Sequence, residues 1–258
     1  MSDPHHADTL ERIQSALEAA RQVFTRFTAG AIEAEYKAGH DPVTEADRAV
    51  DAVLQKELLR AGEGWLSEES VDDLSRLERK RVWIVDPLDG TREFVKRNGE
   101  FTVNIALVQE HEPVLGVVAA PALGLLFWGA SGVGAFSRHG GAAEVPIKVS
   151  PPQSPLRVVG SRSHASAETA GYLARLGPHA MTGIGSSLKF CLVAEGKAEL
   201  YPRFGPTSEW DTAAGQALLE AAGGHVTRLD GHRLRYNCRA SVINGDFLAF
   251  SHPSVLPR

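Results

Sequence analysis

Hydrophobic residues near the start of the chain recur with helical spacing. From Asp8 to about Phe27 they predict a first helix, and Asp8 with Glu11 forms the capping pair that would start it. A second run with apolar residues on one face predicts a helix that begins at Thr44, with Asp47 in its cap, and ends near residues 61–62. The chain is therefore expected to open with two helices.

The pattern then changes to one of strands. A short β-rich run at 81–85 is expected to stop at Asp86-Pro87, because proline interrupts the ladder. From Phe101 to Leu107, apolar residues alternate with less apolar ones, which predicts a half-buried strand. Further strands are expected at 113–119, 125–129, 133–136 and 144–149. Such a series predicts an antiparallel or mixed sheet with helices laid against it.

The segment 150–155, rich in proline and serine, divides the chain, because it can sustain neither a helix nor a ladder of strands. Beyond it, strands are expected at 156–160 and 198–201 and helices at 164–176, 188–195 and 211–222, and Asp230-Gly231 is typical of a hairpin turn. The sequence predicts an α+β or α/β protein with an N-terminal subdomain over 1–150 and a C-terminal one over 151–258.

The composition is that of a globular protein and argues against membrane-spanning and nucleic-acid-binding classes. With 258 residues, 43% hydrophobic and 23% charged, the chain can bury a core without disulfides. Its two cysteines, the charged first helix and the lack of a run near the roughly 20 apolar residues of a membrane span predict a cytoplasmic protein. Peripheral association with a membrane stays open. A net charge of −5 argues against a nucleic-acid partner, although bound cations can still create a site for a small anion.

The most informative stretch is Val85-Asp86-Pro87-Leu88-Asp89-Gly90-Thr91. Two carboxylates beside a kinked backbone can bind hard cations through oxygen, and the Leu88 carbonyl can join them. Gly90 lets the backbone approach a phosphate, and Thr91 at a helix start offers amide and hydroxyl donors. An ordinary strand-to-helix turn is the alternative interpretation, because Asp and Gly are common in such turns.

Two other acidic positions favour the metal-binding interpretation. Glu68 and Glu69 follow an apolar pair and would otherwise lie in a solvated loop. Asp211 stands at the start of an Ala-rich helix, where it would otherwise be an N-cap. Four carboxylates at the ends of predicted elements, with no Cys or His in ligand-like spacing, indicate magnesium or manganese rather than zinc.

The acidic motifs resemble those of a known family. Glu68-Glu69, the stretch 86–91 and the stretch 210–215 are similar to the three metal-binding motifs of the lithium-sensitive inositol monophosphatase superfamily. The segments 92–107, 185–196 and 201–207 resemble its CysQ branch, the bacterial 3'(2'),5'-bisphosphate nucleotidases. Glu93 agrees with that branch, because inositol monophosphatases typically have Asn there.

The resemblance implies a fold, a reaction and a set of ligands. The fold would be a layered α-β-α-β-α sandwich, and the reaction would be hydrolysis of 3'-phosphoadenosine 5'-phosphate to AMP and phosphate, in sulfur metabolism. Two or three Mg²⁺ ions, replaceable by Mn²⁺, would bind per site. The first would be held by Glu68, Asp86 and the Leu88 carbonyl, and the second by Asp86, Asp89 and Asp211.

The same resemblance implies roles around the reacting phosphate. Gly90 and Thr91 would contact it, Asp47 would hydrogen-bond Thr91, and Glu69 would help a further water or ion. Asp47, Glu69 and Thr91 are thus the expected catalytic residues. The metal ligands Glu68, Leu88, Asp89 and Asp211 would also border the substrate.

The second phosphate has its own candidates. Ser187, near a helix start, can donate a hydrogen bond, and Lys189 adds a positive charge. The stretch 161–164 and Arg203 are further candidates, and all of these residues could instead be solvated surface. An inositol or sugar monophosphatase, or a catalytically inactive nucleotide sensor, are the alternative functions. The expected partner is a small bisphosphorylated nucleotide, and both a monomer and a homodimer are compatible with the sequence.

Overall fold

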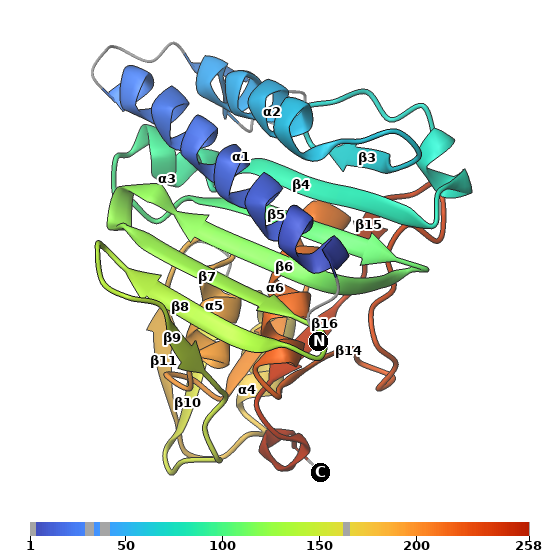
Figure 1. Cartoon of the computed structure of the whole chain (residues 1–258). Helices are drawn as coiled ribbons and strands as arrows, with labels where there is room; N and C mark the ends of the chain where they lie inside the picture. The colour runs from blue at the N-terminus through green and yellow to red at the C-terminus, as the bar shows by residue number, and fades with distance from the viewer. Residues whose placement is uncertain (1–3, 29–33, 37–41, 162–165, 258) are drawn as a thin grey trace.

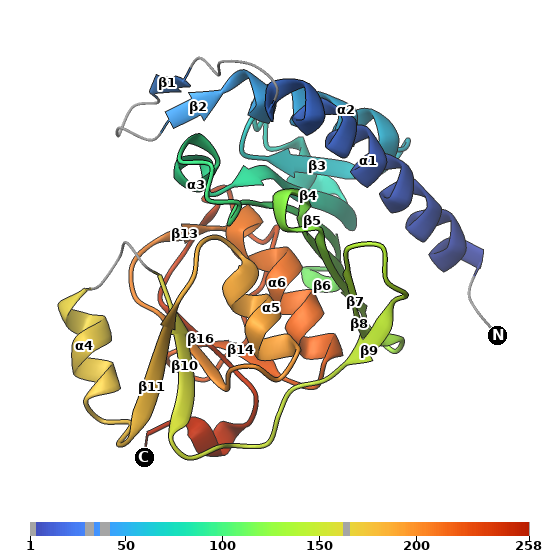
Figure 2. The same cartoon turned by 90° about the vertical axis from the view of Figure 1, so that its left-hand side faces the viewer.

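The computed structural model describes residues 4–28, 34–36, 42–161 and 166–257, and they form five stacked layers (Figures 1 and 2). Helices α1 (Pro4–Thr28) and α2 (Glu45–Leu58) cover one face of a seven-stranded sheet. Helices α5 (Leu188–Ala194) and α6 (Glu209–Ala221) lie between that sheet and a five-stranded sheet. Helix α4 (Ala167–Leu173) lies on the outer face of the second sheet. The expected α-β-α-β-α sandwich is confirmed.

The first sheet has the strand order β3-β4-β5-β6-β7-β8-β9. Strands β3 and β4 are parallel, and the other neighbours are antiparallel, so the sheet is mixed, as expected. The strands are β3 (Gly64–Ser67), β4 (Arg81–Asp89), β5 (Thr102–Gln109), β6 (Glu112–Ala120), β7 (Leu125–Ala130), β8 (Gly134–His139) and β9 (Val145–Ile147).

The second sheet has the order β11-β10-β12-β16-β14 and is also mixed. Its strands are β10 (Leu156–Gly160), β11 (His179–Gly183), β12 (Leu200–Arg203), β14 (His225–Arg228) and β16 (Phe247–Phe250). Two small ladders pair β1 (Ala34–Tyr36) with β2 (Pro42–Thr44) and β13 (Thr207–Ser208) with β15 (Ile243–Asn244). Short helix α3 (Thr91–Val95) follows β4. Whether the chain divides into subdomains near residue 150 stays a prediction.

Three hydrophobic clusters fill the spaces between the layers. One surrounds α5 and α6 between the two sheets and includes Phe190 and Leu218. Another lies beneath α1 and α2 and includes Phe24 and Trp83, and the third lies beneath α4 around Tyr172. Cys191 is buried in the first cluster, and both it and Cys238 are free thiols. Among the described residues, no helix combines the length and the hydrophobicity needed to cross a bilayer.

The expectation of a half-buried strand at 101–107 is wrong. Every residue of β5 from Thr102 to Val108 is buried, because α1 and α2 cover one face of the sheet and α6 covers the other. The polar residues of the alternation, Thr102 and Asn104, therefore face protein rather than water. Buried polar groups of this kind need partners within the fold.

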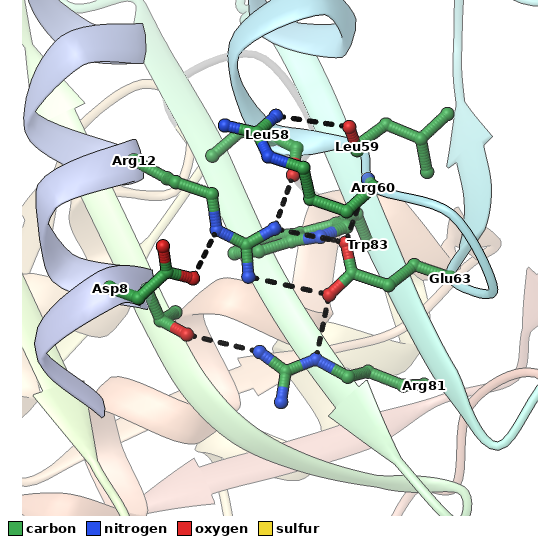
Figure 3. A network of polar contacts seen from close by, with 9 residues as sticks. Asp8, Arg12, Leu58, Leu59, Arg60, Glu63, Arg81 and Trp83 are labelled. Carbon is green, nitrogen blue, oxygen red and sulfur yellow. Dashed lines mark hydrogen bonds and ion pairs between the residues drawn. The ribbon is translucent and has the colours of Figure 1, made fainter. Parts of the chain in front are cut away.

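A polar network anchors α1 to the edge of the first sheet (Figure 3). The carboxylate of Glu63 accepts hydrogen bonds from Arg12 Nη1 at 3.1 Å, Arg81 Nε at 2.9 Å and Trp83 Nε1 at 2.9 Å. Burial raises the pKa of Glu63, but the hydrogen bonds from Arg12 and Trp83 outweigh it, so the net pKa is lowered and the group stays ionised. The network joins the first helix to β4.

Several predicted boundaries need correction. Helix α1 begins at Pro4, so Asp8 does not start it and instead pairs with Arg12 Nε at 3.1 Å. Helix α2 begins at Glu45 and ends at Leu58, before residues 61–62. The helix expected at 164–176 is shorter, and residues 164–165 lie outside the described ranges. The sequence pattern does not reveal strands β3, β11, β14 and β16. Strands β3 and β16 are short and buried, so their residues need not alternate, and β11 and β14 are short and largely exposed.

The turn at Asp230-Gly231 is confirmed. Gly231 has a φ of 84°, and its N–H donates to Arg228 O at 3.0 Å. The following chain returns beside β14 through a single bridge between Thr227 and Arg233.

Candidate functional site

The end of β4 contains a bulge that shapes the acidic motif. Asp86 is paired with Asn104 of β5 and Asp89 with Thr102, so three steps along β4 oppose two along β5. The extra residue is accommodated around Pro87, which has no N–H to give to a ladder. The expectation that Pro87 ends the strand is therefore wrong. The strand continues to Asp89, and the bulge places both carboxylates at the same end of it.

Asp211 joins these two carboxylates from a distant part of the sequence. One carboxylate oxygen of each of Asp86, Asp89 and Asp211 lies within 4.8 Å of the others. Asp211 is the third residue of α6, and its Oδ2 accepts the Ser208 N–H at 2.7 Å. Ser208 is thus the N-cap, and Asp211 completes a capping box rather than being the cap itself.

Two glycines allow α6 to approach the sheet closely enough for this. A Cβ at Gly116 of β6 would lie 2.2 Å from Ala214 O, and one at Gly129 of β7 would lie 2.8 Å from the Cβ of Ala221. Neither strand could carry a side chain there without displacing the helix. The backbone of α6 therefore rests directly on β6 and β7, which sets the position of Asp211.

The electrostatics of the cluster favour a bound cation. Burial raises the pKa of Asp86 well above its ordinary value, and the charges of Glu68, Asp89, Asp211 and Asp47 raise it further. Burial, followed by the charge of Asp89, raises the pKa of Asp211 to about 7. Asp86 Oδ2 is buried and has no hydrogen-bond donor among the described residues. Mutually repelling carboxylates with an unpaired buried oxygen fit a positive ion.

The other predicted acidic residues surround this cluster. Glu68 follows β3 and lines a cavity of about 300 Å³ together with the three aspartates. Glu69 is nearly buried, and its carboxylate lies 4.0 Å from Arg48 Nε. Asp47, in the first turn of α2, is buried and near enough to influence Asp86. The residues that line the cavity include neither Asp47 nor Glu69.

The stretch after Asp89 forms one wall of the cavity. Gly90 is the N-cap of α3 with a φ of 90°, a conformation that favours glycine. The Thr91 hydroxyl lies 3.5 Å from the Leu88 carbonyl oxygen, and the Leu88 N–H donates to Asp86 Oδ1 at 3.0 Å. Leu88, Gly90 and Thr91 all line the cavity, and their contacts with a metal or a phosphate stay predictions.

The opposite wall comes from the start of α5 and from β12. The Ser187 hydroxyl donates to Asp89 Oδ2 at 2.8 Å. Lys189 is buried, donates to Ser186 O at 2.5 Å and lies 5.4 Å from the centre of the Tyr201 ring. Burial lowers the pKa of Lys189, although the charge of Asp89 opposes this shift. Roles for Ser187 and Lys189 in substrate binding stay predictions.

The remaining candidates for the second phosphate divide into two groups. Ser161 and Arg203 line the cavity. Arg162, Ser163 and His164 lie outside the described residues. Sequence reasoning missed Thr102 and Asn104, which contact Asp89 from β5. The signal that could have found them is a polar pair inside a strand that is otherwise apolar.

Comparison with known proteins agrees with this geometry. The model of the inositol monophosphatase family matches residues 6–253. The chain is 50% identical over 214 residues to a protein of Escherichia coli K12 named 3'(2'),5'-bisphosphate nucleotidase CysQ, a match covering 82% of this chain and 86% of that one. It is 48% identical over 239 residues to the CysQ of Salmonella typhimurium, which covers 91% and 94% of the two chains.

Solved structures show the same fold. The crystal structure of CysQ from Bacteroides thetaiotaomicron superposes with a TM-score of 0.83 at 37% identity, over 95% of this chain and 97% of that one. A structure described as an IMPase/NADP phosphatase also superposes with a TM-score of 0.83, at 22% identity, over 98% of this chain and 95% of that one. The second likeness is one of fold alone.

Proposed function

Because the chain belongs to the inositol monophosphatase family, we propose that it is a 3'(2'),5'-bisphosphate nucleotidase that converts 3'-phosphoadenosine 5'-phosphate to AMP and phosphate. The observation that carries the proposal is the convergence of Asp86, Asp89 and Asp211 on one cavity. The high identity to proteins named as such nucleotidases supports the choice of a bisphosphorylated nucleotide.

The carboxylates supply ligands for Mg²⁺. We propose two ions, replaceable by Mn²⁺, held by Asp86, Asp89 and Asp211 with Glu68 and the Leu88 carbonyl, and a third that Glu69 would help to hold. Oxygen donors without Cys or His suit these hard cations. When bound, such ions stabilise the charge that develops on the phosphate during hydrolysis. The carboxylates themselves hold the ions in place and, once neutralised by them, no longer repel one another.

The residues after Asp89 would hold the phosphate that is removed. Gly90 has no side chain, so a phosphate oxygen can approach the backbone of the cavity wall. Thr91 would donate its hydroxyl, and Asp47, buried near Asp86, would orient Thr91 from α2. In this proposal the scissile phosphate would lie next to the carboxylate cluster.

Donors without acceptors mark the part of the cavity suited to the second phosphate. Arg203 Nε and the Ser186 hydroxyl are buried and have no hydrogen-bond partner among the described residues. Both residues line the cavity, as does Lys189. Two cationic side chains and a free hydroxyl in one wall can neutralise and hydrogen-bond a phosphate. An inositol monophosphate has no second phosphate to place there, so the arrangement favours the bisphosphate.

The test is phosphate release from 3'-phosphoadenosine 5'-phosphate and from inositol 1-phosphate, each with Mg²⁺ and with a chelator. We expect metal-dependent release that is fastest from the nucleotide. Asp86→Asn should abolish it, whereas Asp73→Asn, an exposed change away from the cavity, should not. Faster turnover of inositol 1-phosphate would overturn the substrate assignment. Binding of the nucleotide without phosphate release would indicate an inactive sensor.

A further inference from the structure

One carboxylate oxygen of Asp89 is surrounded by three polar side chains. Its Oδ2 accepts hydrogen bonds from Ser187 Oγ at 2.8 Å, from Asn104 Nδ2 at 3.3 Å and from Thr102 Oγ1 at 3.3 Å. Thr102 and Asn104 come from β5, and Ser187 precedes α5. All three donors are buried, with exposed fractions of 0%, 1% and 3%. Water therefore has little access with which to replace them.

The two carboxylate oxygens of Asp89 have different roles, because only Oδ2 accepts the three hydrogen bonds. A carboxylate oxygen offers about two lone pairs, so three donors leave Oδ2 no room for another partner. Oδ1 is then the oxygen available to a cation. Because a carboxylate held on one side cannot rotate freely, its free oxygen stays directed at the cluster with Asp86 and Asp211.

Ser187 also connects Asp89 to the helix of Asp211. Its hydroxyl accepts from Asn104 Nδ2 at 2.9 Å and lies 3.1 Å from the Asp211 carbonyl oxygen. The single hydroxyl proton favours Asp89, which is nearer and charged and is therefore the stronger acceptor. Ser187 thus stands where the two ligand-bearing segments, the end of β4 and the start of α6, meet.

The register of the first sheet supplies the other two donors. Thr102 is the strand partner of Asp89, and Asn104 is the partner of Asp86. The bulge in β4 therefore brings Asp89 within reach of both side chains at once. Among the residues that the structure describes, neither side chain donates to another acceptor, apart from the Ser187 hydroxyl that accepts from Asn104.

We propose that Thr102, Asn104 and Ser187 are positioning residues that hold Asp89 in the orientation a divalent cation needs. This Asp89 clamp rests on the proposed function in that it requires a cation to bind at the cluster. It assigns the Ser187 hydroxyl to Asp89 rather than to the second phosphate of the substrate.

The clamp is tested by titrating the full chain with Mn²⁺ in a calorimeter without any substrate. We expect Ser187→Ala to weaken Mn²⁺ binding about 10–100-fold, in line with the effect of removing groups that orient metal ligands. Thr102→Val removes one longer hydrogen bond at constant shape and should weaken binding less. Thr102→Ser keeps the hydroxyl and should bind like the wild type.

A matched control separates the clamp from a general loss of buried hydrogen bonds. Tyr236→Phe also removes a buried hydroxyl, which bonds Thr212 Oγ1 at 3.2 Å and Gln216 Oε1 at 2.9 Å and does not touch Asp89. It should lower the melting temperature but leave Mn²⁺ affinity unchanged. Circular dichroism on every variant identifies any that fails to fold.

Turnover supplies a second readout for Ser187→Ala. If the hydroxyl acts through Asp89, excess Mg²⁺ restores kcat, and the ratio of kcat/KM for a bisphosphate to that for a monophosphate stays unchanged. Mn²⁺ affinities of Ser187→Ala and Thr102→Val within twofold of the wild type would overturn the clamp. So would unchanged Mn²⁺ affinity with a loss confined to the bisphosphate, which would assign Ser187 to the second phosphate.

The wild-type chain distinguishes failure of the clamp from failure of the proposed function. A wild type that binds Mn²⁺ but releases no phosphate from any nucleotide would overturn the proposed function, while the clamp would still be judged by the variants' affinities. A wild type that binds no Mn²⁺ at millimolar concentration would overturn both.

Discussion

A single added methyl group should test how α6 is held. In Gly116→Ala, the new Cβ would lie 2.2 Å from Ala214 O and 2.9 Å from the Cβ of Ala217. An ordinary contact is 3.4–4 Å, so the helix and the strand would have to separate by about 1 Å. The obstacle is backbone on one side and a methyl on the other, and neither can rotate away.

Two opposing free-energy changes decide the outcome. Replacing glycine by alanine inside a strand favours folding by roughly 0.5–1 kcal/mol. Overpacking a well-packed core costs about 1–3 kcal/mol. Because the nearest obstacle is a backbone oxygen, the cost should lie in the upper part of this range, at about 2–3 kcal/mol. The clash should therefore exceed the gain by about 1–2.5 kcal/mol, which lowers the melting temperature of a chain of this size by roughly 2–10 °C. Because α6 carries Asp211, a 1 Å shift should also reduce phosphate release by about 100-fold.

Thermal unfolding followed by circular dichroism, with phosphate release at saturating Mg²⁺, measures both effects. Gly171→Ala is the matched control, because Gly171 lies in α4 with nothing within 4 Å of the added Cβ. It should raise stability by about 0.4–1 kcal/mol and leave activity unchanged. A Gly116→Ala protein as stable as the wild type would refute the close packing of β6 and α6. Lost stability with full activity would show that Asp211 does not move with the helix.

Three other predictions follow from the same geometry. Burial raises the folded pKa of Asp211 to about 7, above its unfolded value, so the metal-free protein should lose stability as pH rises from about 4 through 7. In the presence of a chelator, Asp211→Asn should flatten this pH dependence of stability, and an unchanged slope would refute the role of Asp211. The folded pKa of Glu63 is lowered, so its carboxylate stabilises the protein at pH values above its unfolded pKa of about 4.3, and that stability is lost as pH falls through the folded pKa. In urea unfolding, Glu63→Gln should cost about 1–3 kcal/mol at pH 7 and progressively less in acid. An equal cost at every pH would contradict the ion pairing. Lys189→Met keeps most of the buried side-chain volume but removes the charge. The loss in kcat/KM, expressed as free energy, should be about 1.5–3 kcal/mol larger for the bisphosphate than for a monophosphate. Equal losses for the two substrates would make Lys189 structural.

The acidic site could be recognised from local sequence because its candidate ligands lie in short sequence motifs. The stretch from Asp86 to Thr91 combines carboxylates, a proline that interrupts the ladder and a glycine, and each residue type has a reason to be there. Glu68 and Asp211 fall at the ends of predicted elements, which is where side chains reach a shared site. The five-layer order followed from resemblance, since alternation of helices and strands alone leaves the arrangement of sheets open.

Local pattern misjudged β4 and β5 because neighbours decide what happens there. Pro87 would end an isolated strand, but pairing of β4 with β5 resumes at Asp89 after a bulge. The alternation in β5 is the pattern of a strand with one solvent-exposed face and one buried face. It reflects instead a face whose polar residues, Thr102 and Asn104, hydrogen-bond Asp89 inside the protein.

The sequence by itself determined which residues are candidates for a cation site, because oxygen ligands for a hard cation are recognisable as residue types at the ends of elements. The distances among them were decided by the tertiary structure alone. Asp86 and Asp211 are far apart in the chain, and the helix of Asp211 is placed by its contact with Gly116 and Gly129 on neighbouring strands. Burial then raises the pKa values of Asp86 and Asp211. No local pattern encodes that gathering, because it depends on how closely two backbones from separate halves of the chain can approach.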